Sequence, residues 1–115
     1  KGISSATTFT AADATRTSAA DLQKVTLGIW NGTMISGSLR NTILGYMNRQ
    51  VYRQGIPAGS KGRVYDKVGF LWDYLNDASV VVHPKGTYSL VIMTKGSSWA
   101  HIAEITRQIE AIMYS

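Results

Sequence analysis

Three apolar runs separated by turn residues lie between Gly62 and Gly96. The first run reads GRVYDKVGFL, a polar break follows at WDYLND, and the second run reads ASVVVHP. A KGT turn then leads into the third run, YSLVIMTKG. Runs rich in β-branched and aromatic residues and bounded by turn residues are typical of strands. The pattern therefore predicts an antiparallel meander of three strands over residues 62–96.

A helical region, residues 17–53, is predicted before the meander. Its first helix begins at Thr17 or Ser18 and ends at Asn31-Gly32. Ser18 and Asp21 have the spacing of a capping box, and Asn-Gly is typical of a helix C-terminus. The same pair followed by Thr33 also matches an N-glycosylation sequon, but the helix end is the favoured interpretation. The apolar stripe of this helix comprises Leu22, Val25 and Ile29, with Trp30 as a further candidate.

Two further helices are predicted, one from about Ser38 to Val51 and a last one over residues 97–115. The last helix begins at Ser97 or Ser98 and reaches Tyr114. Residues 1–16 are loop-like, with a short extended piece expected at residues 6–10, and Gln54–Gly62 is a Gly/Pro loop. The residues at helical spacing are Leu39, Ile43, Tyr46 or Met47 and Val51 in the earlier helix, and Trp99, Ile102, Ala103, Ile105, Ile109, Ile112 and Met113 in the last.

Consecutive apolar positions at Val80–Val82 and Leu90–Met93 indicate that both faces of the sheet are covered. The last helix can cover one face, and the two earlier helices can cover part of the other. The predicted fold class is therefore α+β, a three-stranded antiparallel meander packed by helices in the order ααβββα. No internal repeat or linker divides residues 1–115, so a single domain is expected.

Composition narrows the function classes. Twelve Lys and Arg against seven Asp and Glu give a net charge of +5, and the basic residues are scattered along the chain. A nucleic-acid-binding surface would need a basic cluster interleaved with exposed aromatic residues, so no nucleic-acid partner is predicted. The charge favours solubility and some attraction for anions. The chain has no apolar run of membrane-spanning length and no cysteine, which excludes disulfides and a thiol nucleophile.

No metal site and no cofactor are predicted. The two histidines, His83 and His101, cannot complete a metal cage alone. His101 and Glu104 have one-turn spacing on a helix, but a solvated pair is the favoured interpretation. The chain begins at Lys1 with no initiator Met and no signal peptide, so we expect a processed or excised piece of a longer protein.

The candidate binding residues lie in the first predicted strand. Lys67 precedes Gly69 by two residues, so both point to the same face. A glycine inside a strand often marks a place where a ligand comes close, and a cation beside bare backbone suits an anionic substrate. The more frequent explanation of such an isolated pattern is a lysine that guards an edge strand against aggregation and a glycine that marks a bulge.

The order of elements and several stretches resemble the C-terminal part of the penicillin-recognising serine hydrolases, which include class A β-lactamases and D-alanyl-D-alanine peptidases. TSAADLQKVTLGIWNG resembles the helix after the active-site loop, and QVYRQGIPAG resembles the approach to the first strand. VYDKVGFL resembles the Lys-Thr-Gly strand, and YSLVIMTKGSSWAHIAEITRQI the last strand and terminal helix. GISSATTF is similar to the loop before the first helix in the peptidase-like members. The resemblance implies acyl-enzyme chemistry on β-lactams or peptidoglycan peptides, outside the cell or in its envelope.

The resemblance also implies roles for individual residues. Lys67 would bind the substrate carboxylate beside Gly69, and Phe70 would lend its backbone N–H to an oxyanion hole. Val68 departs from the pattern, because a Thr or Ser hydroxyl would contact the carboxylate there. The nucleophile is missing, since no Ser in the 115 residues has a Lys three positions later. Tyr46-Met47-Asn48 fits the Tyr-x-Asn variant of the second motif but is interpreted as helix surface and core.

Two hypotheses follow, and whether the chain is part of an enzyme stays open. It is either the C-terminal half of a serine hydrolase, with the missing N-terminal half of the fold as its partner, or a non-catalytic module that binds a peptidoglycan-like ligand or a partner protein. In the family, the strand resembling Tyr88–Thr94 is flanked by strands from the start of the full-length chain. Its outer edge would be open here and would favour a homodimer, unless residues 6–10 fold back to cap it.

Overall fold

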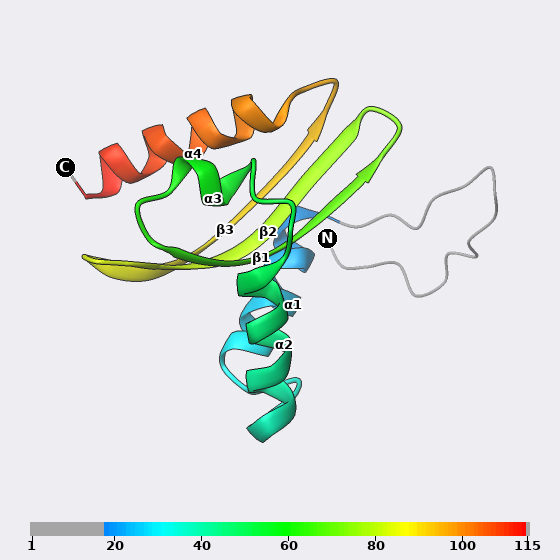
Figure 1. The fold of residues 1–115 in the computed structure, drawn as a ribbon, viewed down its shortest axis with the longest axis vertical. Helices are drawn as coiled ribbons and strands as arrows, with labels where there is room; N and C mark the ends of the chain where they lie inside the picture. The colour runs from blue at the N-terminus through cyan, green and yellow to red at the C-terminus, as the bar shows by residue number, and fades with distance from the viewer. Residues whose placement is uncertain (1–17, 115) are drawn as a thin grey trace.

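The computed structural model describes residues 18–114 and confirms the predicted α+β fold (Figure 1). The loop predicted over residues 1–16, with its extended piece, lies outside the described residues. In chain order the elements are α1 (Ala19–Trp30), α2 (Gly37–Arg49), α3 (Ile56–Gly59), β1 (Arg63–Leu71), β2 (Tyr74–His83), β3 (Gly86–Lys95) and α4 (Trp99–Met113).

The sheet is antiparallel with the order β1-β2-β3, as the meander requires. The predicted polar break WDYLND is wrong in extent, because only Trp72 and Asp73 lie outside the strands. The polar residues Asn76 and Asp77 belong to β2, where they pair with residues of both β1 and β3. Pairing on both sides satisfies the backbone donors and acceptors of this stretch. This pairing outweighs the weak preference of its polar side chains for strands.

Helices cover both faces of the sheet. Figure 1 shows α3 and α4 on one face and α1 and α2 on the other, with α2 against β1 and α1 against β2 and β3. The prediction that both faces are covered is therefore confirmed. Between the sheet and the α3–α4 layer lies the apolar core of Ile56, Val64, Val81, Ile92 and Ile102.

The helix starts were readable from the sequence. The Ser18 Oγ accepts a hydrogen bond from the Asp21 N–H at 3.2 Å, and the Ser98 Oγ accepts one from the His101 N–H at 3.1 Å. Each bond satisfies one of the N–H groups that have no partner inside the helix. Gly32, with a φ of +75°, follows α1 in the left-handed conformation that commonly ends helices.

The apolar stripes were predicted less well. In α2 only Leu44 is buried, while Leu39 and Tyr46 are exposed and Val51 lies beyond the helix at 86% exposure. In α4 the terminal Ile112 is 79% exposed. Helical spacing identifies a face, but it does not show how far the covering elements extend along that face.

The predicted loop Gln54–Gly62 contains the short helix α3, which packs between β1 and α4. Pro57 lies in the first turn of α3, where its missing N–H costs nothing. A Cβ at Gly59 would lie 2.0 Å from the Ala103 carbonyl oxygen, so this glycine permits close contact with α4.

A buried carboxylate, Glu110, ties the end of α4 to the rest of the fold. It accepts hydrogen bonds from the Ser60 Oγ at 2.5 Å, from the Lys61 N–H at 2.9 Å and from the Tyr88 hydroxyl. The His83 Nε2 lies 3.5 Å from its Oε1. Burial opposes ionisation of Glu110, but these donors outweigh it and lower its pKa. Conversely, burial and the hydrogen bond to Glu110 raise the pKa of Tyr88.

Candidate functional site

Lys67, Val68, Gly69 and Phe70 line one depression of about 490 Å³. Neighbouring side chains on a strand point to opposite faces, so a depression that all four residues line lies along the outer edge of the strand. Among the described residues β1 pairs only with β2, which leaves that edge free. The remaining lining comes from α2, the segment after it and β1 itself: Tyr46, Met47, Gln50, Tyr52 and Asp66.

The register shows which backbone groups face the free edge. Leu71 and Tyr74 flank the two-residue turn, so they form a hydrogen-bonded pair, and such pairs recur at every second residue. By that alternation Val68 and Phe70 direct their backbone N–H and C=O groups outward. Two contacts agree with this assignment: the Lys67 Nζ donates to the Val68 carbonyl, and the Arg53 Nη2 donates to the Val64 carbonyl at 2.9 Å.

Lys67 is exposed and forms no ion pair with any residue in the range 18–114. Among the described residues, its ammonium group bonds to the Val68 carbonyl alone, which is a neutral acceptor. A ligand carboxylate at the edge of β1 would be a stronger acceptor for the same donor. Val68 itself is buried on the opposite face, so its side chain packs in the α3–α4 layer.

Gly69 is required neither by packing nor by its backbone conformation. A Cβ added there would meet no atom of the described part of the chain within 4 Å, and the φ of Gly69 is not in the left-handed region. The register runs one-to-one through Lys67↔Ala78, Val68↔Asp77 and Gly69↔Asn76, so no bulge occurs at this position. The bulge explanation of the glycine is therefore wrong, and open space remains beside the strand.

Aromatic rings lie close to Lys67, further along β1. The Phe70 ring lies edge-on to the Tyr52 ring, with 5.3 Å between centroids, and to the Trp99 ring, with 6.3 Å. Phe70 and Tyr52 are about half exposed. The site thus offers a positive charge, outward backbone donors and apolar surface, which suits a ligand with a carboxylate next to an apolar or amide-bearing group.

Beneath the depression lies a buried acidic pair that sequence reasoning missed. Asp66 and Asp77 are at most 1% exposed. The Arg53 Nη1 lies 3.5 Å from the Asp66 Oδ1, and the Ile56 N–H donates to the Asp77 Oδ2 at 3.0 Å. The signal was the alternation Val64-x-Asp66-x-Val68, which places the Asp66 carboxylate on the same buried face as two valines.

The acidic pair shares one proton at neutral pH. Burial, with the hydrogen bond to Asp66 and the charge of Asp66, raises the pKa of Asp77 to about 9. Within residues 18–114, both Asp66 oxygens and the Asp77 Oδ1 lack any other hydrogen-bond donor. A proton on Asp77 supplies that donor, and the charge of Asp66 is then balanced by Arg53.

The other residues singled out from the sequence lie partly at the depression and partly away from it. Tyr46 is exposed at the rim of the depression, whereas Asn48 lines a separate hollow with Trp30 and Tyr65. The His101 Nδ1 bonds to the Ser97 hydroxyl and Glu104 bonds to neighbours on its own helix. Within residues 18–114 no three acidic or histidine side chains gather in a way that could hold a metal ion. None of the described helices is long and apolar enough to cross a membrane.

Comparisons with known proteins agree with the fold. The chain belongs to the Beta-lactamase enzyme family, which it matches over residues 3–114. The structure of PBP-A is similar at 25% identity and a TM-score of 0.74, with 84% of this chain and 40% of that chain covered. A PBP-A mutant solved as an acyl-enzyme complex with penicillin G gives 25% identity and a TM-score of 0.71 over the same shares. No curated protein matches the chain.

A β-lactamase from Sphaerobacter thermophilus shares the fold, with a TM-score of 0.68 at 21% identity, over 82% of this chain and 39% of that one. The chain therefore spans about 40% of the length of the structures it matches. The resemblance to the C-terminal part of a penicillin-recognising serine hydrolase is confirmed at the level of family and fold.

Proposed function

We propose that this chain supplies the substrate-binding strand of a serine hydrolase that acts on β-lactams or peptidoglycan peptides by acyl-enzyme chemistry. The observation that carries the proposal is the outer edge of β1, with which no other described strand pairs. Lys67, the open space at Gly69 and the outward N–H of Phe70 border one depression there. Family membership supports the reaction class. Substrates of this kind place the protein outside the cell or in its envelope.

In this proposal, Lys67 and the backbone of Phe70 contact the substrate directly. Lys67 binds the substrate carboxylate by a charge-assisted hydrogen bond. The Phe70 N–H donates to the carbonyl oxygen that becomes negative when a serine attacks. That serine must come from outside these residues, because the sequence holds no Ser-x-x-Lys. The missing N-terminal half of the fold, as the partner of this chain, would supply it.

Binding of a peptide ending in D-alanyl-D-alanine, and of benzylpenicillin, tests the proposal by calorimetry. Lys67→Ala should weaken both by about tenfold to a hundredfold, since a hydrogen bond to a charged group contributes roughly 1.5–3 kcal/mol. Lys24→Ala, which removes an equal charge from the exposed side of α1, is the matched control and should bind normally. Equal affinities for the two variants would remove β1 from the site.

The chain alone should form no acyl adduct with benzylpenicillin, because it contains no activated serine. Mass spectrometry after incubation checks this expectation. A stoichiometric adduct on any serine would place a nucleophile within these residues and contradict the assignment.

A non-catalytic module that binds a peptidoglycan-like ligand or a partner protein is the second candidate. It is favoured by the valine at position 68, where the family pattern has a hydroxyl, and by the absence of a nucleophile motif. The sequence upstream of Lys1 separates the two candidates. Ser-x-x-Lys followed by Ser-x-Asn there supports the enzyme, and a natural chain without them supports the module.

A further inference from the structure

The turn between β1 and β2 carries a tryptophan that folding does not explain. Trp72 has a φ of +55°, and its side chain is 72% exposed. The left-handed region favours glycine, followed by Asn and Asp, and is rare for a bulky residue. Neither backbone preference nor burial accounts for an indole at this position.

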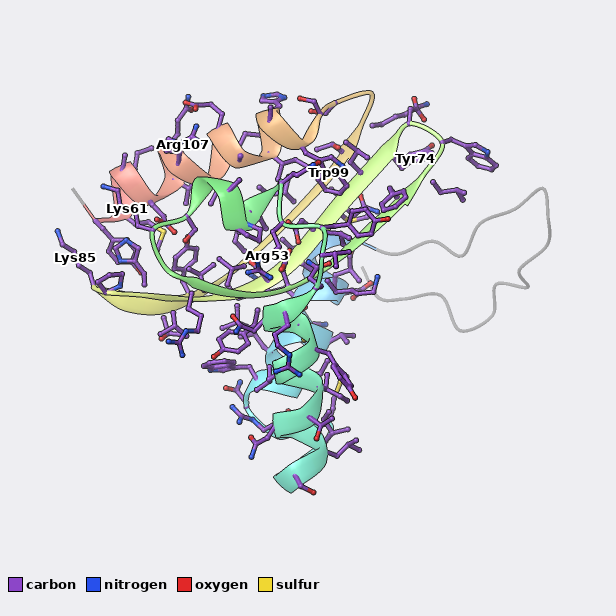
Figure 2. The ribbon with its side chains drawn as sticks, in the orientation of Figure 1. Arg53, Lys61, Tyr74, Lys85, Trp99 and Arg107 are labelled. Atoms are coloured by element: carbon purple, nitrogen blue, oxygen red, sulfur yellow. The ribbon has the colours of Figure 1, made fainter. Side chains whose placement is uncertain are left out.

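The indole lies at an apolar end of the sheet. Phe70 and Leu71 before it and Tyr74 after it are also exposed. The Lys95 Nζ lies 5.7 Å from the Tyr74 ring centroid, so this cation is directed onto an aromatic face. Figure 2 shows Tyr74 at this end of the sheet, with Lys61 and Lys85 at the opposite end. Exposed aromatic side chains of this kind mark contact surfaces.

The exposed aromatic end of the sheet lies next to the candidate site, on the same strand. Lys67 and Leu71 are four residues apart on β1, which corresponds to about 13 Å along the strand, and Trp72 follows directly in the turn. An extended peptide of four or five residues has the same length. A peptide that lay antiparallel to β1, against the outward groups of Val68 and Phe70, would have its carboxylate at Lys67 and its N-terminal end at Trp72.

The chemistry of peptidoglycan suits both Lys67 and Trp72 as contact points. A stem peptide has a free carboxylate at its C-terminus, and its N-terminus is linked to an N-acetylated amino sugar. One face of a pyranose ring presents C–H groups that pack on an aromatic ring, while its hydroxyl groups need polar partners. Asp73, exposed next to Trp72, offers such a partner.

We propose that Trp72 is a platform for the sugar of a glycan-linked stem peptide, so that the ligand of this site is the peptide attached to its glycan rather than a free peptide. The inference rests on the proposed function, because it takes the carboxylate to bind at Lys67. It assigns Trp72 to specificity and gives a reason for an aromatic residue at a strained, exposed turn.

The test measures the affinity of the full chain for two probes by calorimetry. One is N-acetylglucosaminyl-N-acetylmuramyl pentapeptide, and the other is the same pentapeptide without sugar. The glycosylated probe should bind about tenfold more tightly. Trp72→Gly should abolish that difference between the two probes, and Trp72→Tyr should retain most of it. Glycine suits the positive φ, so Trp72→Gly should not lower the melting temperature.

The outcomes separate this inference from the proposed function. If both probes bind equally and Lys67→Ala weakens both, the proposed function stands and the role of Trp72 is overturned. If the glycosylated probe binds more tightly but Trp72→Gly retains the difference, the sugar lies elsewhere and the inference fails. If neither probe binds, the proposed function and the inference fail together.

Discussion

Replacing Asp77 by asparagine should stabilise the fold at neutral pH. Asp77 is fully buried, and burial together with the hydrogen bond and charge of Asp66 raises its pKa from 3.8 to about 9. Asparagine has nearly the same shape and carries no charge. Its Oδ1 can accept the hydrogen bond of the Ile56 N–H, and its amide N–H can donate to Asp66 in place of the proton.

Proton binding to Asp77 makes the free energy of unfolding depend on pH. Between about pH 4 and about pH 9 the folded chain holds a proton on Asp77 that the unfolded chain releases. The free energy of unfolding therefore falls as the pH rises. The contribution of this group is fully present below pH 3.8 and is lost as the pH approaches about 9. At pH 7 the loss is on the order of 4 kcal/mol, from about three pKa units at roughly 1.4 kcal/mol each.

Urea unfolding, followed by tryptophan fluorescence between about pH 5 and about pH 8.5, measures this effect. The wild-type midpoint should fall across that range, and the Asp77→Asn midpoint should be higher and nearly constant. Asp73→Asn is the control, because Asp73 is exposed and its replacement should leave the pH dependence unchanged. A wild-type stability that stays constant over the range, or a loss of stability in Asp77→Asn at pH 7, would refute the shared proton.

Three other outcomes are expected. Gly69→Ala should leave stability unchanged or raise it by up to about 1 kcal/mol, yet weaken the benzylpenicillin complex by filling the open space; an unchanged affinity would contradict a ligand beside Gly69. Glu110→Gln should cost about 1–3 kcal/mol in thermal unfolding because glutamine keeps one acceptor oxygen and replaces the other with an NH2 donor, so that part of the buried donors lose their acceptor, while Glu104→Gln on the exposed face of α4 should cost little. The chain should associate through the outer edge of β3 in sedimentation, and Val91→Pro should reduce the association; a concentration-independent monomer whose Val91 amide exchanges freely with solvent would contradict it.

The helices and strands could be predicted from local sequence patterns. The errors of prediction concerned buried polar residues, whose hydrogen-bond partners lie far away in the sequence. The caps Ser18 and Ser98 were readable because a cap depends on neighbours within one turn. The buried face of α4 was predicted as wholly apolar, yet it includes Thr106 and Glu110. Glu110 is buried because donors come from Ser60 and Tyr88, far away in the sequence, and no local pattern reveals them.

The candidate site was predictable only in part for the same reason. The spacing of Lys67 and Gly69 placed both on one face of a strand, which needs nothing beyond the alternation of side chains. The partnership of Asp66 with Asp77 and Arg53 depends on the register between β1 and β2 and on the path of the chain before α3. The strain at Trp72 is likewise a property of the two-residue turn, whose length the sequence overestimated.

The acidic pair also sets the charge that a ligand meets. With one proton on Asp77, the charges of Asp66 and Arg53 cancel, and the positive charge of Lys67 remains for an anion. Ionised Asp77 would add a buried negative charge opposite Val68, on the face of the sheet away from the Lys67 side chain, and would reduce the positive potential at this edge of β1. Affinity for a D-alanyl-D-alanine peptide should therefore fall as the pH rises through about 9, whereas Asp77→Asn should retain it. An equal loss in both proteins would show that the proton on Asp77 serves the fold and has no part in ligand binding.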